Sequence, residues 1–147
     1  MIRKATMDDV QELASNMRED DQKECWDIAR MDPFTAAAAG YASGTAEALV
    51  SDGGCFVGLA GVVPKDNGEG LVWMLTTDKV KEHALQLVRE GRDWLDAVSK
   101  DYTRIHNVVT VQNKLHVRLI KAMGFTFRPK VNNYFGLGVD VYPFERK

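Results

Sequence analysis

The pattern of apolar and polar positions in the first part of the chain predicts a short strand and two helices. The segment MIRKAT alternates, and MDDVQELASNM after it has apolar residues at helical spacing, with Asp8 or Asp9 as the expected helix cap. The polar run REDDQKE interrupts this apolar stripe, and Pro33 closes the segment that follows, because proline cannot donate inside a helix. A second helix is expected from near Pro33 to the SDGG turn, with a stripe of small and aromatic residues that extends to Thr45, Ala48 and Leu49.

The rest of the chain predicts further strands and two amphipathic helices. CFVGLAGVV and LVWMLTT are expected to form an antiparallel pair of strands joined by the turn-rich PKDNGEG. A long helix follows Asp78, then a strand RIHNVVTVQN, then the helix KLHVRLIKAM, which Asn113 would cap and Gly124 would end. FTFRP and NYFGLGVDVYPF supply the last strands. Helical spacing predicts which residues of these two helices face the core. They are Val80, Ala84, Leu87, Gly91, Trp94 and Val98 on the long helix, and Leu115, Leu119, Ile120 and Met123 on the last helix.

This order of elements, β-α-α-β-β-α-β-α-β-β, predicts an α+β (α/β-like) fold. We expect a mixed, mostly antiparallel central sheet flanked by about four helices. No repeat, linker or low-complexity tract divides the chain, so residues 1–147 should form a single domain. A chain of this length can bury a core without disulfides or metal.

Composition and charge narrow the class of protein. The chain is 45% hydrophobic and 27% charged, as globular proteins are. A net charge of −2 gives no general field that would attract nucleic acid or an anionic membrane, so neither is an expected partner. No stretch approaches the roughly 20 apolar residues of a membrane span, and the N-terminus lacks the apolar core of a signal peptide. We therefore expect a cytoplasmic protein.

The chemistry-bearing residues lack several well-known patterns. Cys25 and Cys55 have no CxxC or Cys/His spacing, so they are expected to be buried thiols and not metal ligands. His83, His106 and His116 fit no metal motif, and no metal site is expected. Walker, GxGxxG and GxSxG motifs are absent, which leaves the P-loop, Rossmann and hydrolase classes without support.

One stretch, VVTVQNKLHVRLIKAMGFTF, resembles the fourth-helix segment of the GNAT acyltransferases. In that family a strand ends at an asparagine, a helix follows, and the helix stops at Gly-Phe before the next strand. The element order over nearly the whole chain is similar to that family too. More narrowly, GVVP, VWMLTTD and HVRLIKAMG resemble a GNAT-like family of small proteins in short-tailed bacteriophages, which includes internal virion proteins. The resemblance implies a GNAT fold, acetyl-CoA as the cofactor, and a virion or host protein as the partner, with the virion as a second location.

The resemblance also locates a cofactor site. GNAT enzymes hold the pyrophosphate of coenzyme A with a glycine-containing loop between the fourth strand and the third helix. The matching stretch here, TTDKVKEH, has no glycine, and Asp78 puts a carboxylate near the N–H groups that a pyrophosphate would need. Asp78 or Thr77 can equally be an ordinary helix cap. The cofactor-binding residues that the resemblance implies are Leu75, Thr76, Thr77, Lys79, Val80, Lys81 and Asn113.

Acetyl transfer needs a general base and a general acid. GNAT enzymes often place a tyrosine four residues before the glycine of Gly-Phe as the acid, but Ile120 stands there in this chain. Tyr134, or otherwise Tyr41, would have to approach from elsewhere. In the acidic run REDDQKECWD, Glu24 is the candidate base, although a solvated acidic face explains such a run as well.

Two functions of different class remain. The departures at Asp78 and Ile120 favour a non-catalytic or weakly catalytic phage protein that keeps the GNAT fold and binds a virion or host protein. The alternative is an acetyl-CoA-dependent N-acetyltransferase that acts on a protein or a small amine. A basic stripe on the last helix, at Lys114, Arg118 and Lys121, is either a solvated face or a contact for a phosphate, an acidic protein or a nucleic acid.

Overall fold

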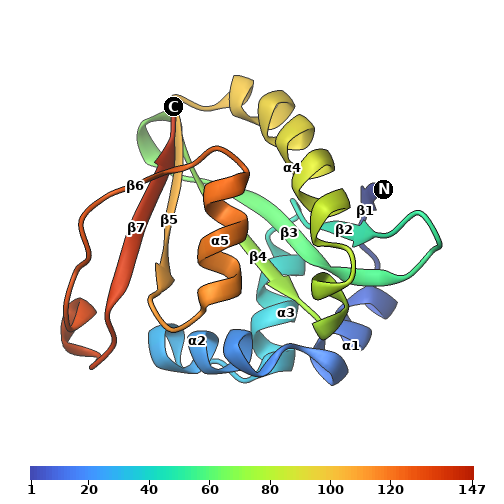
Figure 1. Ribbon diagram of the computed structural model, residues 1–147, viewed down its shortest axis with the longest axis horizontal. Helices are drawn as coiled ribbons and strands as arrows, with labels where there is room; N and C mark the ends of the chain where they lie inside the picture. Colours follow the sequence, from blue (N-terminus) through green and yellow to red (C-terminus); the bar gives the residue numbers. More distant parts are fainter.

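A seven-stranded sheet with helices on both faces makes up the computed structural model, which describes all residues from 1 to 147 (Figure 1). The strands lie in the order β1-β2-β3-β4-β5-β7-β6, and every neighbouring pair is antiparallel except β4 and β5. The predicted α+β fold with a mixed, mostly antiparallel sheet is therefore confirmed. The strands are β1 (Ile2–Lys4), β2 (Glu47–Val50), β3 (Phe56–Pro64), β4 (Glu69–Thr76), β5 (Arg104–Thr110), β6 (Thr126–Phe127) and β7 (Val141–Arg146).

Five α-helices surround the sheet, one more than expected. They are α1 (Met7–Asn16), α2 (Glu19–Ala29), α3 (Pro33–Ala42), α4 (Ala84–Val98) and α5 (Lys114–Ala122). Figure 1 shows α1 and α3 behind the sheet, α4 and α5 in front of it, and α2 across its lower edge beneath α5. No helix of the chain combines the length and the apolar character that crossing a membrane would require.

Side chains alternate along the strands and fill two hydrophobic cores, one on each face of the sheet. On β2, Ala48 and Val50 join Leu13 of α1 and Ala37 of α3, whereas Leu49 joins the core beneath α4 and α5. The inward faces predicted for the two amphipathic helices belong to this second core. Their buried members are Val80, Leu87, Gly91, Leu119, Ile120 and Met123, and Ala84, Trp94, Val98 and Leu115 are half-buried around them.

The sequence did not predict α2 as a separate helix. Its inward positions carry Asp21 and Glu24 where an ordinary amphipathic helix has apolar residues, so the helical period of hydrophobicity is missing. The polar run that interrupted the apolar stripe is therefore a helix of its own. It ends at Arg30, whose backbone has a φ of 55°.

The predicted second helix was too long. It ends at Ala42, and Gly44, with a φ of 79°, turns the chain so that residues 47–50 form β2 between β1 and β3. Thr45, Ala48 and Leu49 are therefore not helical. Small apolar residues fit either period, and only pairing with two distant strands selects the extended form.

Two further local expectations were wrong. Thr6, and not Asp8 or Asp9, caps α1, because its side chain accepts from the N–H of Asp9 while the Asp9 carboxylate accepts from the N–H of Thr6 at 2.8 Å. The last strand begins only at Val141.

Part of the segment predicted as that strand is instead the 3₁₀ turn η4 (Tyr134–Gly136). Asn133 and Phe135, at the start and centre of the turn, have φ of 48° and 47°, which a strand does not allow. Gly124 ends α5 with a φ of 95°, as predicted.

Candidate functional site

The parallel strands β4 and β5 pair only over their first residues and then separate. Pairing covers residues 69–71 of β4 and 104–106 of β5. At the next position the Asn107 side-chain amide donates to the carbonyl oxygen of Val72 at 2.6 Å, and its own oxygen accepts from the N–H of Val108 at 2.7 Å. The carboxyl ends of the two strands thus face each other across a split. In sheets with parallel strands, ligand crevices lie outside the carboxyl ends of such strands.

A cavity of about 160 Å³ lies at this split. Residues of β4 and β5 line it together with residues of α4 and α5, and 16 of the 20 lining residues are hydrophobic. The polar members are Glu24, Asn107 and His116, with Trp73 as an aromatic member. A largely apolar hollow with a few polar groups is the usual form of a small-molecule site.

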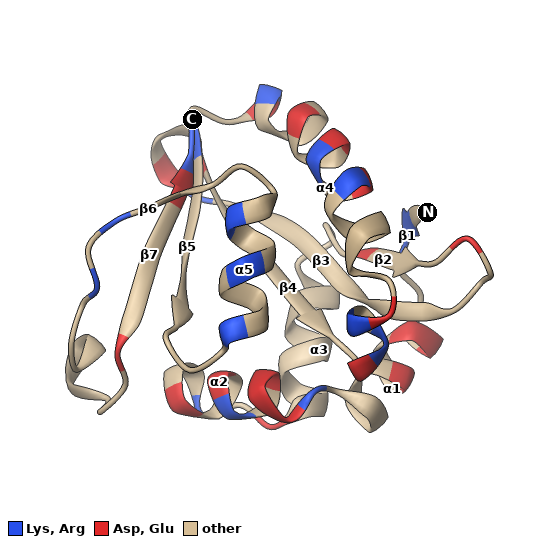
Figure 2. Ribbon diagram, viewed as in Figure 1, with Lys and Arg blue, Asp and Glu red and all other residues tan.

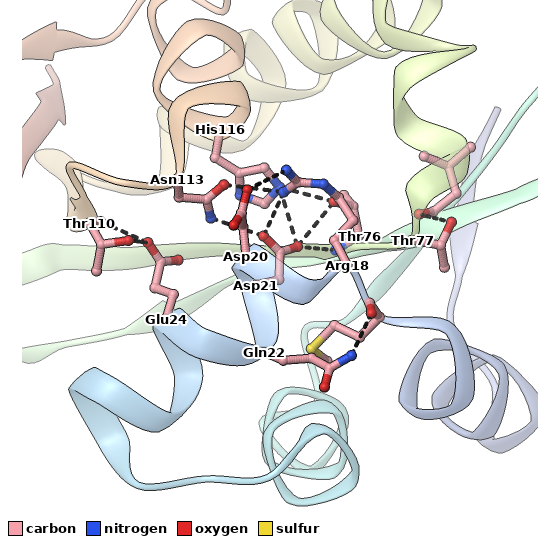
Figure 3. Close-up of polar contacts among 12 residues, drawn as sticks. Arg18, Asp20, Asp21, Gln22, Glu24, Thr76, Thr77, Thr110, Asn113 and His116 are labelled. Atoms are coloured by element: carbon pink, nitrogen blue, oxygen red, sulfur yellow. Dashed lines mark hydrogen bonds and ion pairs between the residues drawn. The ribbon is translucent and has the colours of Figure 1, made fainter.

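Asp21 of α2 closes the β4 side of the split (Figure 3). Its carboxylate accepts from the N–H of Thr76 at 2.8 Å and from the Thr76 hydroxyl at 3.1 Å. The N–H of Arg18 donates to the carbonyl oxygen of Thr76 at 2.9 Å. Both backbone groups that the last residue of β4 would offer to a neighbouring strand or to a ligand are therefore already used.

The charge of Asp21 is matched by a buried guanidinium. Arg18 Nη1 donates to Asp21 at 2.9 Å and to Asn113 Oδ1 at 3.1 Å, and the Asn113 amide donates to Asp21 at 2.9 Å. Arg18 is 4% exposed, and Asp21 and Asn113 are 0% exposed. A buried ion pair needs such additional hydrogen bonds to offset its desolvation. Arg18 Nε, however, has no partner.

This network changes the role predicted for Asn113. The residue stands at the N-cap position of α5, but its side chain makes no capping hydrogen bond. Its amide instead joins Asp21 and Arg18, because these buried groups need a neutral donor and acceptor between them. The predicted cap was wrong, although the start of α5 was right.

His116 extends the network from α5. Its Nε2 lies 2.9 Å from the Thr76 hydroxyl, which itself donates to Asp21. The hydroxyl has one proton, so it accepts from His116, and the hydrogen-bond pattern assigns the imidazole proton to Nε2. Burial lowers the pKa of His116, and the side chain is therefore neutral at pH 7.

Glu24 closes the β5 side of the split. Its carboxylate accepts from the N–H of Thr110 at 2.7 Å and from the Thr110 hydroxyl at 2.8 Å. Burial raises the pKa of Glu24 to about 7, although the hydrogen bonds from Thr110 act in the opposite direction. Asp21 and Glu24 are three residues apart on one face of α2, so one helix holds the ends of both strands.

The segment predicted to hold a pyrophosphate has its own internal hydrogen bonds. Thr77 caps the 3₁₀ turn η2 (Asp78–Lys81): its hydroxyl accepts from the N–H of Lys79 at 3.3 Å and donates to Val57 at 3.2 Å. The N–H of Val80 donates to the carbonyl oxygen of Thr77 at 3.1 Å. Two of the backbone donors expected for an anion are thus already bonded.

The long helix does not begin at Asp78 as predicted. Asp78 and Lys81 are exposed on η2, and α4 starts only at Ala84, with His83 at its N-cap position and no side-chain cap. A 3₁₀ turn therefore separates the end of β4 from the helix.

The structure does not bring the predicted catalytic residues together at one site. Glu24 lines the cavity together with Ile120, which occupies the position of the family's tyrosine. Tyr134 does not line it: its ring packs on Phe135 with centroids 4.6 Å apart, in the η4 turn. Tyr41 lies on α3, on the other face of the sheet, and is 38% exposed. Among the predicted cofactor residues, Leu75 lines the cavity and Thr76 and Asn113 belong to the network.

Sequence reasoning missed Arg18, Asp21, Thr110 and His116. Arg18, Asp21 and Glu24 recur every three residues, a spacing that marks one helix face only after α2 itself is recognised. The two cysteines, expected to be buried, are free and half-buried, and burial raises the pKa of Cys25 to about 12.

Solved structures with the same fold are GNAT-family acetyltransferases. One from Bacillus anthracis has a TM-score of 0.76 at 14% identity and aligns with 99% of this chain and 92% of its own. Spermidine N-acetyltransferase from Vibrio cholerae, in complex with CoA and spermine, has a TM-score of 0.72 at 15% identity, with 99% and 94% of the two chains covered. Phosphinothricin acetyltransferase from Sinorhizobium meliloti, with AcCoA, has 0.65 at 13%, with 99% and 86% covered. At these identities the likeness establishes the GNAT fold alone.

Sequence comparison points to bacteriophage. No curated protein sequence matches the chain significantly. A protein-family model matches residues 58–132, from β3 through β4, α4, β5 and α5 to the segment after β6. The match includes Thr76, Thr110, Asn113 and His116 and leaves out α2, which supplies the carboxylates. On this match the chain belongs to the family described as "Bacteriophage T7, probable scaffold protein Gp13".

Proposed function

We propose that the chain is a GNAT-fold phage protein that works by binding, as a virion-associated or host-interaction protein, with little or no acetyltransferase activity. One observation carries this proposal. Asp21 and Glu24 occupy the carboxyl ends of the split strands and take the N–H groups of Thr76 and Thr110. A ligand that bound there would have to displace two carboxylates and leave the Arg18 guanidinium without its main partner.

Electrostatics supports the same conclusion. Coenzyme A brings several phosphate charges, and Asp78 places an exposed carboxylate at the start of the η2 turn, which also carries Lys79 and Lys81. A carboxylate a few Å from a phosphate is repulsive by about 1 kcal/mol in water, and by more where solvent is excluded. The absence of glycine from residues 76–83 adds to this cost, because only glycine lets the backbone approach an anion most closely.

Family membership supports a structural role. The family description names a probable scaffold protein. A protein that helps to build a particle has to bind other proteins, but it does not have to convert a substrate. Fold alone does not imply the acetyltransferase activity of the structural relatives.

Calorimetric titration with acetyl-CoA at pH 7.4 tests this function. We expect dissociation constants beyond millimolar for the natural chain and for Asp78→Asn, which removes a charge but keeps a good capping side chain. Micromolar binding by the natural chain, together with release of free coenzyme A in the presence of an amine, would overturn the proposal. Detection of the chain in purified particles of the encoding phage would separate a virion role from a host-interaction role.

A specific observation favours acetyl transfer as the second candidate. Glu24 lines the apolar cavity with its pKa raised to about 7, which suits a general base that deprotonates an amine near neutral pH. Backbone groups alternate in direction along β4, so those of Met74 point toward the split, as those of Thr76 do. The carboxylates of α2 bond to Thr76 and do not contact Met74. In this case Glu24→Gln would abolish amine-dependent release of coenzyme A while the fold stays intact.

A further inference from the structure

The outer face of α5 carries a row of three exposed cations, Lys114, Arg118 and Lys121 (Figure 2). The helix contains no acidic residue. None of the three cations takes part in an ion pair within the chain. The chain as a whole has a net charge of −2, so this row makes the surface of α5 locally positive.

The row sits on a rigid support. Neighbours in the row are four and three residues apart, which on an α-helix corresponds to about 6 Å and 4.5 Å along the axis. The opposite face of α5 is buried through His116, Leu119 and Ile120. At the end of the helix, Arg92 of α4 donates to the carbonyl oxygen of Ala122 at 2.8 Å. The spacing of the charges is therefore held by the core and does not depend on a partner.

We propose that this row binds the acidic face of a helix in a partner protein. An α-helix that lies parallel to α5 and has carboxylates at positions i, i+4 and i+7 repeats the same spacing, so that each cation meets one carboxylate. Complementary charge steers such an encounter and fixes its register. The inference rests on the proposed function as a binding protein and names the chemistry of its partner.

Nucleic acid fits this surface less well. A phosphate backbone continues beyond three charges, and beyond the start of α5 lies α2, a helix rich in acidic residues whose first turn has exposed carboxylates at Glu19 and Asp20 (Figure 2). The short row therefore favours a compact acidic segment over an extended polyanion.

A second copy of the chain also fits less well. Asp20, Glu24 and Asp27 of α2 have the required spacing, but Glu24 is bonded to Thr110 and Asp27 is paired with Lys23 at 2.7 Å. A contact with α5 of another molecule would have to break both. The acidic helix is therefore expected on a different protein.

Two synthetic helical peptides of identical composition test the inference. One has its glutamates in a single i, i+4, i+7 row, and the other distributes them around the helix. We expect the natural chain, at 50 mM NaCl, to bind the row peptide several-fold more tightly than the scrambled one. Lys114→Gln, Arg118→Gln and Lys121→Gln together should weaken the row peptide about tenfold and remove the discrimination, as three exposed ion pairs would.

A matched variant controls for net charge. Lys65→Gln, Lys100→Gln and Lys147→Gln remove the same three charges at exposed positions away from α5, and should leave the peptide affinity within twofold. Equal affinity for both peptides, tighter binding of single-stranded oligo-dT, or a self-association that only the α5 variant loses would each overturn the inference. Competition of the row peptide by coenzyme A would instead count against the proposed function, so the two failures are distinguishable.

Discussion

Replacement of Asp21 by alanine should be the most damaging single change in the network. The Asp21 carboxylate is fully buried and accepts from Arg18, Thr76 and Asn113 at 2.8–3.1 Å. Its removal leaves the Arg18 guanidinium, 4% exposed, without its main counter-ion, and leaves the N–H of Thr76 without an acceptor. Breaking a buried pair from one side costs about 3 to 5 kcal/mol, a large part of the stability of an ordinary domain.

Urea denaturation followed by tryptophan fluorescence measures this loss. With a slope of about 1 to 3 kcal/mol per molar urea, the midpoint should fall by roughly 1 to 5 M. Asp20→Ala is the control, because Asp20 meets the same Arg18 at 3.3 Å while 50% of its side chain is exposed. An exposed partner of this kind contributes about 0 to 1 kcal/mol.

The difference between the two variants tests whether the Arg18–Asp21 pair is buried in solution. If Asp21→Ala cost no more than Asp20→Ala, the Arg18–Asp21 pair would not be a buried pair in solution. The argument that α2 fills the split would then lose its support.

Three further predictions follow from the same site. Asn113→Asp should destabilise the fold by about 1 to 3 kcal/mol by urea denaturation, because it sets a second carboxylate beside Asp21; a true N-cap would tolerate aspartate. Because the pKa of Glu24 is raised to about 7, protonated Glu24 contributes about 3 kcal/mol of folding stability that is present below pH ~4.5 and lost as the pH rises through about 7. Glu24→Gln should flatten the dependence of the unfolding free energy on pH between pH 5 and 8, and an unchanged pH dependence would contradict this account. Trp94→Ala should cost less than the roughly 3 to 5 kcal/mol of a fully buried tryptophan, because Trp94 is only half-buried; a melting curve like that of the natural chain would remove it from the core.

The parts of the fold that the sequence predicted are those with a clear period. The β3–β4 pair and the inward faces of α4 and α5 follow from regular spacing of large apolar residues, and all are found in the structure. β2 could not be predicted from its own residues. Ala48 and Leu49 are extended because β1 and β3 lie on either side of them, a contact that no local pattern encodes.

The candidate site was predictable only in part, and for a different reason. Glu24 and Asn113 were identified from residue type and from the resemblance, but their partners were not. The network forms because α2 turns polar residues inward, against the usual rule that a helix buries apolar ones. The rule fails where split strands leave backbone donors that need acceptors, as at Thr76 and Thr110.

The split and the carboxylates that fill it belong to one physical problem. Once β4 and β5 separate, the N–H groups of Thr76 and Thr110 lack a partner on the neighbouring strand, and a buried donor without an acceptor costs about 1 to 3 kcal/mol. Either a ligand or the chain itself must supply the acceptors. Asp21 and Glu24 supply them from a helix outside the matched family region, and Arg18 brings the positive charge that a buried carboxylate requires. A fold that satisfies its own split in this way needs no cofactor to complete the hydrogen bonds of Thr76 and Thr110.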